Sequence, residues 1–586
     1  MKKILVLTVA AAASAMSVNA DFALNLDLSG KPVRDVRTSR CGPIVGYAGC
    51  LMGNDDDTFW FDKNKYETAR ALKEAGAWHQ RMWSSNAWFA RRHPNPYKEG
   101  TKEYKKYKQS NPDAAFKFWK ENGFKIMFTL EAWGGERARK EIYEFVKYIV
   151  DNDYKDVVAG FELGNESYFA KPEHMVPLCK NWANIIDDIL KLWPKAQMGI
   201  PICELFENNP DLTQVRNRML AAGEIKRDTY FAAGYFNQTS AKMIMELKGH
   251  GKLDKISHII YHAYGAESPY SCSYYGMQRF RNFSEAFPEI KGKKFWLTEI
   301  RPRSDEDNRC QRIFREALIM AHYSLMAVMQ PDVDGFNHHQ IFALSGGLYQ
   351  SFGKSWAIQW RDHGSEYPDY RSPFNKPRLD VGAMGVMYRI IAEAIKEHPL
   401  MFHHGTSKEM DTEDTFFTSA RVTDQVYARR RALKEAGNKL DKPLIGSAKR
   451  RRDEVAQIEG EVEWVAATTP NRGELCLIMV NTKPVAETIT LTVPGKRFAA
   501  PTYKTLSCPE KFLDCREVPG EGKPWKAMAW EDTQWGFDVV GMEKYVGMVP
   551  ASDSIDITIE PHTVQSVTVV LGNMPKPTNK PKNQKK

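Results

Sequence analysis

Eight short apolar runs, alternating with stretches of helical periodicity, dominate the first two thirds of the chain. They lie between Gly42 and His398 and read PIVGYAG, AWHQRMW, KIMFTLEAW, VVAGFELGN, AQMGIPI, SHIIYHAYG, KFWLTEI and VDGFNHHQIF. Between them, apolar residues repeat at helical spacing, as over residues 142–150 and 178–193. Strands that alternate with helices form parallel βα units, and eight units of this length predict a (β/α)8 TIM barrel of the α/β class. A doubly wound open sheet is the alternative, although no GxGxxG motif follows an early run.

The pattern changes near residue 404. The apolar runs that follow are of the β type and are separated by turn residues: EVEWVAATT, GELCLIMVNT, ETITLTVPG, PTYKTLSC, SIDITIEP and TVQSVTVVLG. This pattern predicts an all-β sandwich after the barrel. We therefore expect a barrel over residues 41–403 and a sandwich of structural role over residues 404–572. The segment 21–40 contains DFALNLDLSG, which also alternates and is expected to add a strand to the sandwich.

Both ends of the chain indicate segments outside these domains. Residues 1–20, MKKILVLTVAAAASAMSVNA, carry two lysines, an apolar centre and small residues, as a secretory signal peptide does. No later apolar run is long enough to span a membrane. The sequence therefore predicts a secreted or periplasmic bacterial protein with no membrane partner. The Pro- and Lys-rich residues 573–586 are expected to be a disordered basic tail.

The formal net charge of +9 does not indicate a nucleic-acid partner. Much of the excess lies in the terminal tail and in residues 428–454, which read as solvated charge. The nine cysteines are too scattered for a disulfide framework, although Cys41 with Cys50, or Cys508 with Cys515, could pair. They show no metal-type spacing with histidine, so neither a metal nor a cofactor is predicted.

Carboxylates stand at the ends of two of the predicted barrel strands. Glu166 follows the fourth run, in FELGNESYF, and Glu299 ends the seventh, in KFWLTEI. Side chains at the carboxyl ends of barrel strands meet at one mouth, where the active sites of such barrels lie. Two carboxyl groups facing each other there are what cleavage of a glycosidic bond requires.

The fourth and seventh runs resemble the retaining glycoside hydrolases of clan A, with their xylosidase-like, arabinofuranosidase-like and heparanase-like families. These have an aromatic-Glu-x-x-Asn-Glu pattern, matched by Phe161, Glu162, Asn165 and Glu166, and a Thr/Ser-Glu, matched here by Thr298 and Glu299. The resemblance implies that Glu166 is the acid/base and Glu299 the nucleophile that cleave β-glycosidic bonds. It also implies that Asn165 binds the sugar hydroxyl next to the reacting carbon.

Two further strand ends fit this resemblance. Arg81, which follows AWHQ, resembles the arginine that accompanies the nucleophile in the clan, and Tyr264 resembles a tyrosine that donates to it. His262 has the same parity as Tyr264, so both are predicted to face the mouth. Glu162 is expected to support the site from the barrel interior, paired with a neighbour such as Arg81.

The eighth run departs from the clan pattern, because FNHHQIF lacks the tryptophan that often ends that strand. Trp356 or Trp360 from the long following loop are predicted to substitute for it. At most one of His338 and His339 can face the pocket, and we expect His338 to contact substrate there rather than a metal. Trp133, in the loop after the third run, is also predicted to bind substrate.

Arginines recur in the predicted mouth loops: Arg91, Arg92, Arg137, Arg139, Arg301, Arg303 and Arg361. A guanidinium suits sulfate or carboxylate, so we expect an anionic polysaccharide, first a sulfated galactan such as carrageenan or agar. Arg301 is the arginine predicted to bind substrate. A glycosaminoglycan, another uronate-bearing chain or a neutral glycan is the alternative, since these arginines could instead pair with acidic neighbours. A surface protein that binds carbohydrate without turnover, and a polysaccharide lyase, are the competing functions.

Overall fold

The computed structural model describes residues 22–38, 45–48, 69–70, 72–73, 76–107, 109–202, 235–264, 288–301, 314–339, 349–352, 378–381, 383–407, 462–507 and 552–573. Residues 1–20, the basic segment 428–454, both possible disulfide pairs, Trp356, Trp360 and most of the terminal tail lie outside these ranges. Within the described part, no helix has the length and hydropathy needed to cross a bilayer.

Parallel strands close into a barrel in the order β10-β3-β4-β5-β6-β7-β8-β9. Their bounds are β3 Val45–Ala48, β4 His79–Met82, β5 Lys125–Leu130, β6 Val158–Leu163, β7 Met198–Pro201, β8 His258–Tyr264, β9 Lys294–Arg301 and β10 Val333–His339. Each strand coincides with one of the eight predicted apolar runs, β9 extending one residue beyond its run to Arg301, and every pairing is parallel. The predicted barrel is therefore confirmed, and the open-sheet alternative is excluded.

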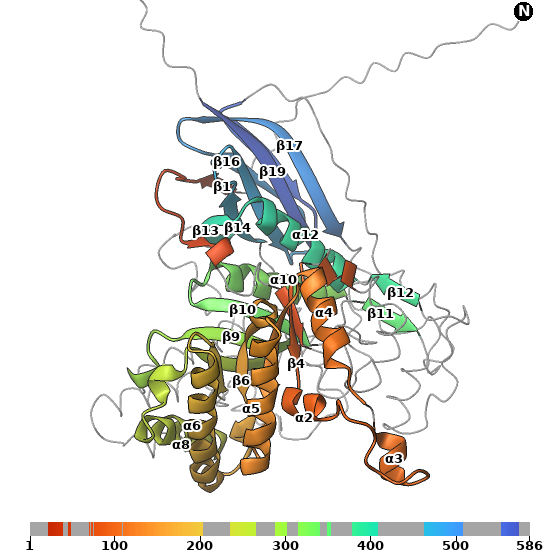
Figure 1. Ribbon diagram of the computed structural model, residues 1–586. Helices are drawn as coiled ribbons and strands as arrows, with labels where there is room; N and C mark the ends of the chain where they lie inside the picture. Colours follow the sequence, from red (N-terminus) through yellow and green to blue (C-terminus); the bar gives the residue numbers. More distant parts are fainter. Residues whose placement is uncertain are drawn as a thin grey trace, which may run out of the picture.

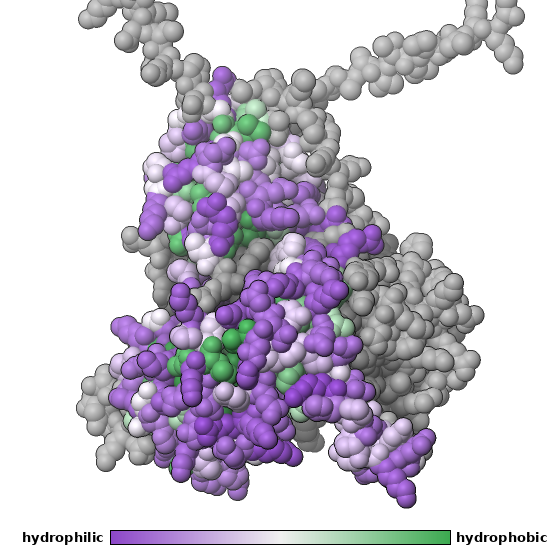
Figure 2. All heavy atoms as spheres, viewed as in Figure 1, coloured by the Kyte–Doolittle hydropathy of each residue, from purple (hydrophilic) through white to green (hydrophobic). Residues whose placement is uncertain are grey.

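Helices connect the strands and cover the barrel (Figure 1). They are α2 Ser85–Ala90, α3 Lys102–Lys106, α4 Pro112–Asn122, α5 Glu136–Asp151, α6 Met175–Leu192, α8 Tyr235–Gly249, α10 Phe314–Met329 and α12 Ala383–Glu397. Helix α5 buries Ile142, Phe145, Val146 and Ile149 along one face, as its periodicity predicts. Hydrophilic side chains cover most of the visible face of α5 and α6, as expected for amphipathic helices (Figure 2).

Short 3-10 turns accompany several of these connections. They are η1 Val36–Thr38, η2 Lys155–Val157, η3 Ser167–Phe169, η4 Pro172–His174, η6 Leu253–Lys255 and η7 Pro288–Ile290. In the long loop after β10, β11 Tyr349–Phe352 pairs antiparallel with β12 Arg378–Val381. The turn η3 begins directly after Glu166 and therefore belongs to the mouth of the barrel.

One antiparallel and one mixed sheet form the C-terminal sandwich, confirming the predicted all-β region. One has the order β17-β19-β15-β14-β13-β2, and the other β1-β16-β18. Their bounds are β1 Phe22–Asn25, β2 Arg34–Asp35, β13 Leu400–Thr406, β14 Val462–Thr468, β15 Glu474–Asn481, β16 Glu487–Thr492, β17 Lys496–Ser507, β18 Ser554–Ile559 and β19 Thr563–Asn573. The N-terminal β1 pairs in parallel with β16, and β2 pairs with β13.

The larger sheet buries both of its faces. On β14, Val462, Trp464 and Ala466 join the core between the two sheets. The alternate residues Val465 and Ala467 join the barrel core. Helices α10 and α12 contact this second face and lie between the sandwich and the barrel (Figure 1). Every residue of β14 is therefore buried, although the strand belongs to an antiparallel sheet.

Candidate active site

Arg81 joins three strands at the mouth of the barrel. It lies at the carboxyl end of β4, and its side chain is completely buried. Its Nε and Nη2 donate to the two carboxylate oxygens of Glu162 at 2.6 and 2.8 Å. Its Nη1 donates to Glu299 at 2.6 Å, and Nη2 also donates to the side-chain oxygen of Asn165 at 2.7 Å. One guanidinium therefore links β4, β6 and β9, which are the second, fourth and seventh strands of the barrel.

Glu162, inside the barrel on β6, is fully buried. Burial acts to raise the pKa of its carboxyl, but the charge and hydrogen bonds of Arg81, together with the His262 imidazole 3.8 Å away, outweigh it and lower the pKa. Glu162 is therefore ionised and holds Arg81 in place, as expected from the sequence pattern.

Glu166 lies just beyond β6, where the chain turns sharply. Its backbone adopts the left-handed conformation (φ 46°, ψ 37°), which is costly for a residue other than glycine. Gly164 precedes it with φ 84°, and a Cβ there would come within 2.4 Å of the Ser167 hydroxyl. The turn presents the Glu166 carboxyl, one quarter exposed, to the mouth. The hydroxyl of Tyr168 donates to its Oε1 at 3.1 Å.

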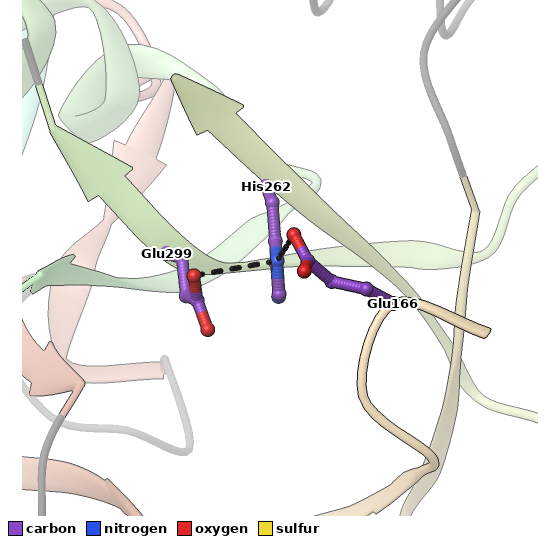
Figure 3. Close-up of side chains that lie close together, drawn as sticks. All are labelled: Glu166, His262 and Glu299. Atoms are coloured by element: carbon purple, nitrogen blue, oxygen red, sulfur yellow. Dashed lines mark hydrogen bonds and ion pairs between the residues drawn. The ribbon is translucent and has the colours of Figure 1, made fainter. Parts of the chain in front are cut away.

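His262 lies between Glu166 and Glu299 (Figure 3). Its Nδ1 is 3.0 Å from Glu166 Oε1 and 3.6 Å from Glu299 Oε2. Burial acts to lower the pKa of the imidazole, but the charge of Glu299, the nearby Glu162 carboxylate and the hydrogen bond to Glu166 raise it to about 9. His262 is therefore a cation at neutral pH, and its Nδ1–H can donate to either carboxylate.

A bulge on β9 explains how His262 is held. Tyr261 of β8 pairs with Leu297, but His262 pairs with Glu299, so Thr298 is an extra residue in the register. The Thr298 hydroxyl lies 3.0 Å from His262 Nε2. The bulge therefore allows Thr298 and Glu299, which are adjacent in sequence, to contact the same imidazole.

Glu166, His262 and Glu299 each offer one atom to a triangle whose corners lie within 4.8 Å of one another. Carboxylates and imidazole are also metal ligands, so the geometry alone would suit a divalent ion. The chemistry favours a proton instead, because a metal would have to displace the Nδ1 proton of an imidazole whose pKa is about 9. Arg81 already supplies a positive charge to Glu299.

The other predicted site residues divide into three groups. Asn165 lies in the site, and Trp133 is 47% exposed just after β5. The backbones of Tyr264 and Arg301 are opposite each other in the register of β8 and β9. Their side chains lie outside the described part. Trp356 and Trp360 lie outside it altogether.

His338 was predicted to face the pocket, but its described contacts are with helix α12. It is buried on β10, where its Nδ1 lies 3.2 Å from the hydroxyl of Tyr388 on α12. The two rings meet edge to face at a centroid distance of 5.6 Å. Alternate residues of a barrel strand face opposite sides, and this one meets the surrounding helix layer.

The sequence interpretation gave no role to three residues of the mouth: Tyr168, Glu131 and Thr298, which entered only as the first residue of the Thr-Glu match. Thr298 enters through a bulge, and Tyr168 through a short turn, which leave no periodic signal. Glu131 directly follows β5, so the rule that barrel chemistry lies at strand ends could have found it.

No family description and no curated protein matches this sequence. Among solved structures, a family 51 α-L-arabinofuranosidase from Bifidobacterium longum is similar with a TM-score of 0.52 and 11% identity, over 94% of this chain and 99% of that one. A glucosidase from Croceicoccus marinus gives 0.46 and 9%, over 94% and 99%. A β-porphyranase of family 86 from Bacteroides plebeius gives 0.44 and 10%, over 94% and 76%. At identities of 9–11% the similarity concerns the fold alone. On the match to the arabinofuranosidase, with its TM-score of 0.52, this chain has the barrel-plus-sandwich fold of clan A-type glycoside hydrolase structures.

Proposed function

We propose that this protein is a retaining glycoside hydrolase that cleaves a polysaccharide by double displacement. The observation that carries the proposal is the approach of Glu166 and Glu299, whose carboxylate oxygens lie within 4.8 Å across the mouth. Carboxyl groups of retaining enzymes are about 5–5.5 Å apart, whereas inverting enzymes leave a wider gap for water.

The environments of the two carboxyls support different roles. Glu299 is nearly buried and receives Arg81 at 2.6 Å, which keeps it ionised for attack on the anomeric carbon. Glu166 is more exposed and gives its proton to the departing glycosidic oxygen. In the second step Glu166 takes a proton from water, which attacks the glycosyl ester and releases Glu299.

His262 supports this exchange, because its Nδ1 is within reach of both carboxylates. In the structure Nδ1 is closer to Glu166 than to Glu299, so in the first step the Nδ1–H must shift its hydrogen bond to the ionised Glu299, which leaves Glu166 to hold its own proton. Once Glu299 is esterified its charge is lost, and the same Nδ1–H can stabilise the Glu166 carboxylate that must act as base. The imidazolium thereby helps Glu166 to change role between the steps.

The charge of the substrate is a finer proposal with weaker support. Of the arginines that suggested an anionic glycan, Arg139 bonds Asp188 at 2.6 Å and Arg92 bonds Glu144 at 3.1 Å. These pairs match the alternative that such arginines have acidic partners. An anionic polysaccharide therefore depends on the remaining arginines, of which Arg301 stands at the end of β9, two residues after Glu299. Arg301→Ala should then reduce turnover of carrageenan more than that of its desulfated form.

The function is tested with a panel of agarose, carrageenan, a glycosaminoglycan, xylan and 4-nitrophenyl α-L-arabinofuranoside. New reducing ends or nitrophenol report cleavage, and proton NMR of the first product reports the anomeric configuration. We expect net retention, and a loss of at least about 10³-fold in Glu299→Gln and Glu166→Gln. Glu144→Gln, on the outer helix α5, is the control and should keep full activity.

Two results would reject the hydrolase. Binding of a glycan without release of products would indicate a carbohydrate-binding protein. Unsaturated products would indicate a lyase. Activity that survives Glu299→Gln would remove the nucleophile from the scheme.

A further inference from the structure

Trp83 and Trp133 are exposed at the same rim of the barrel. Trp83 directly follows β4 and is 41% exposed, and Trp133 follows the adjacent strand β5 and is 47% exposed. Four other tryptophans of the described part, Trp88, Trp119, Trp182 and Trp296, are almost completely buried. Exposed indoles beside a candidate active site indicate a ligand with an apolar face.

Trp83 is also connected to the catalytic groups. The guanidinium carbon of Arg81 lies 5.8 Å from the centroid of its indole, while the same guanidinium bonds Glu299. The next residue, Ser84, has the left-handed backbone conformation (φ 44°), as Glu166 does. Such strained residues gather at functional sites, and here the strain turns the chain immediately after Trp83.

Glu131 brings a carboxyl group to the neighbouring strand end. Its backbone N–H donates to the Asn86 side chain at 2.8 Å, and the Asn86 amide donates to its carbonyl at 3.3 Å. The half-buried carboxyl group accepts a hydrogen bond from the backbone N–H of Asn165. It also lies close enough to Glu162 and Arg81 for their charges to change its pKa. Burial, and then the charge of Glu162, raise the pKa of Glu131. The double-displacement scheme assigns no role to the Glu131 carboxyl group, although its position is fixed by these contacts.

We propose that Trp83 and Glu131 form a sugar-binding subsite beside Arg81, in which the indole stacks on a neutral sugar residue and the carboxylate accepts hydrogen bonds from its hydroxyls. The proposal rests on the hydrolase function and specifies what that site takes. The subsite is for a neutral residue because a sulfate or uronate there would face the carboxyl group of Glu131, while the charge of Arg81 is already matched by Glu162 and Glu299. In an anionic polysaccharide, the charged groups would have to lie on other residues.

The test measures binding separately from turnover. Isothermal titration calorimetry in the Glu166→Gln background uses neutral agarose-derived and xylan-derived oligosaccharides and a sulfated carrageenan oligosaccharide. We expect Trp83→Ala and Glu131→Ala each to weaken binding of the neutral ligand about tenfold or more, as loss of a stacking contact or of a charge-assisted hydrogen bond would. Trp83→Phe should recover part of the loss. Glu131→Gln should improve sulfated relative to neutral binding.

Trp193→Phe is the matched control. Trp193 follows α6, which leads to the amino end of β7, so it lies at the opposite end of the barrel from the site. This variant should bind as the background does, and thermal melting of every variant separates lost binding from lost folding.

The outcomes separate this proposal from the hydrolase itself. Unchanged affinity in Trp83→Ala and Glu131→Ala, with Glu299-dependent cleavage intact, overturns the subsite alone. Affinity that depends on Trp83 and Glu131 without any cleavage by the wild-type protein supports the subsite and rejects the hydrolase. The neutral assignment is overturned if the protein with Glu131 intact already prefers the sulfated ligand and Glu131→Gln leaves the ratio of the two affinities unchanged. Failure of the wild-type protein to bind any of these glycans overturns both proposals.

Discussion

Arg81 is the residue on which the geometry of the site depends. Its guanidinium is the buried cation between Glu162 and Glu299, and it also holds Asn165. Removing one partner of a buried ion pair leaves the other charge without compensation, which costs far more than the loss of an exposed pair. The same substitution should therefore damage both folding and catalysis.

We predict that Arg81→Met lowers the free energy of unfolding by about 3–5 kcal/mol, measured by urea denaturation. Arg81→Lys keeps the charge but not the two-pronged contact with Glu162, so its loss should be smaller. Arg92→Met, which removes a partly exposed pair with Glu144, is the control and should cost less than about 1 kcal/mol. Equal losses in Arg81→Met and Arg92→Met would contradict this account.

At the scale of residues, the position of a strand end largely decides which side chains meet. Glu166 and Glu299 follow from strand ends, Arg81 and Asn165 from the resemblance, and His262 from the parity it shares with Tyr264. The structure brings these five side chains together, and their roles in binding and catalysis stay predictions. Parity allows at most one of His338 and His339 to face the pocket but does not say which. The expectation of His338 is not met, because its ring lies against Tyr388 on α12. The bulge at Thr298 interrupts the alternation of β9, and no sequence pattern predicts it.

At the scale of elements, Gly160 of β6 and Gly199 of β7 make room for one large ring inside the barrel. Trp296 of β9 packs with Met127, Ala159 and Ile260 in the interior. A Cβ on Gly160 of β6 would lie 2.1 Å from the Trp296 ring, so only glycine fits there. The ring has little freedom to withdraw, because the imidazole of His258 stacks on it at 3.7 Å.

We predict that Gly160→Ala lowers the free energy of unfolding by about 1–3 kcal/mol through overpacking. Gly249→Ala is the matched control, because a Cβ at the end of α8 meets open space and should not destabilise the protein. The double variant Gly160→Ala/Trp296→Leu should be less damaged than the sum of its single changes, since the smaller side chain removes the clash. A Gly160→Ala protein as stable as wild type would refute this explanation.

Strand existence was predictable from sequence because each barrel strand is a short apolar run between polar segments. The pairing of β11 with β12 was not, since it joins Tyr349–Phe352 to Arg378–Val381 across a long loop without periodicity. Local sequence reports which residues prefer an extended backbone. It does not report which distant segment completes the hydrogen bonds.

At the scale of the whole molecule, the sandwich and the barrel share one hydrophobic core. Val465 and Ala467 of β14 pack with residues of the barrel helices, while Val462 and Trp464 face the sandwich interior. Charged groups cross the same interface: Lys504 of β17 bonds Glu393 of α12 at 2.8 Å. The two parts should therefore unfold together rather than as separate domains.

A buried charge cluster makes this interface sensitive to acid. Glu463 of β14 accepts hydrogen bonds from His322 of α10 and from His404 of β13, the latter at 2.5 Å. Burial acts to raise the pKa of Glu463, but the charge of His322 and the two hydrogen bonds lower it to about 2. An unfolded glutamate has a pKa of about 4.3, so the unfolded state takes up this proton first as the pH falls.

We predict that Glu463→Gln is less stable than wild type at pH 6 by roughly 3 kcal/mol and that this difference shrinks as the pH falls from about 4.3 toward 2. Urea denaturation at several pH values measures it. Glu393→Gln, which removes a partly exposed contact across the same interface, is the control and should cost less than about 1 kcal/mol at any of these pH values. A difference for Glu463→Gln that stays constant down to pH 2 would mean that lost packing, rather than the charge of Glu463, stabilises the junction. In that case acid unfolding would have to begin elsewhere in the molecule.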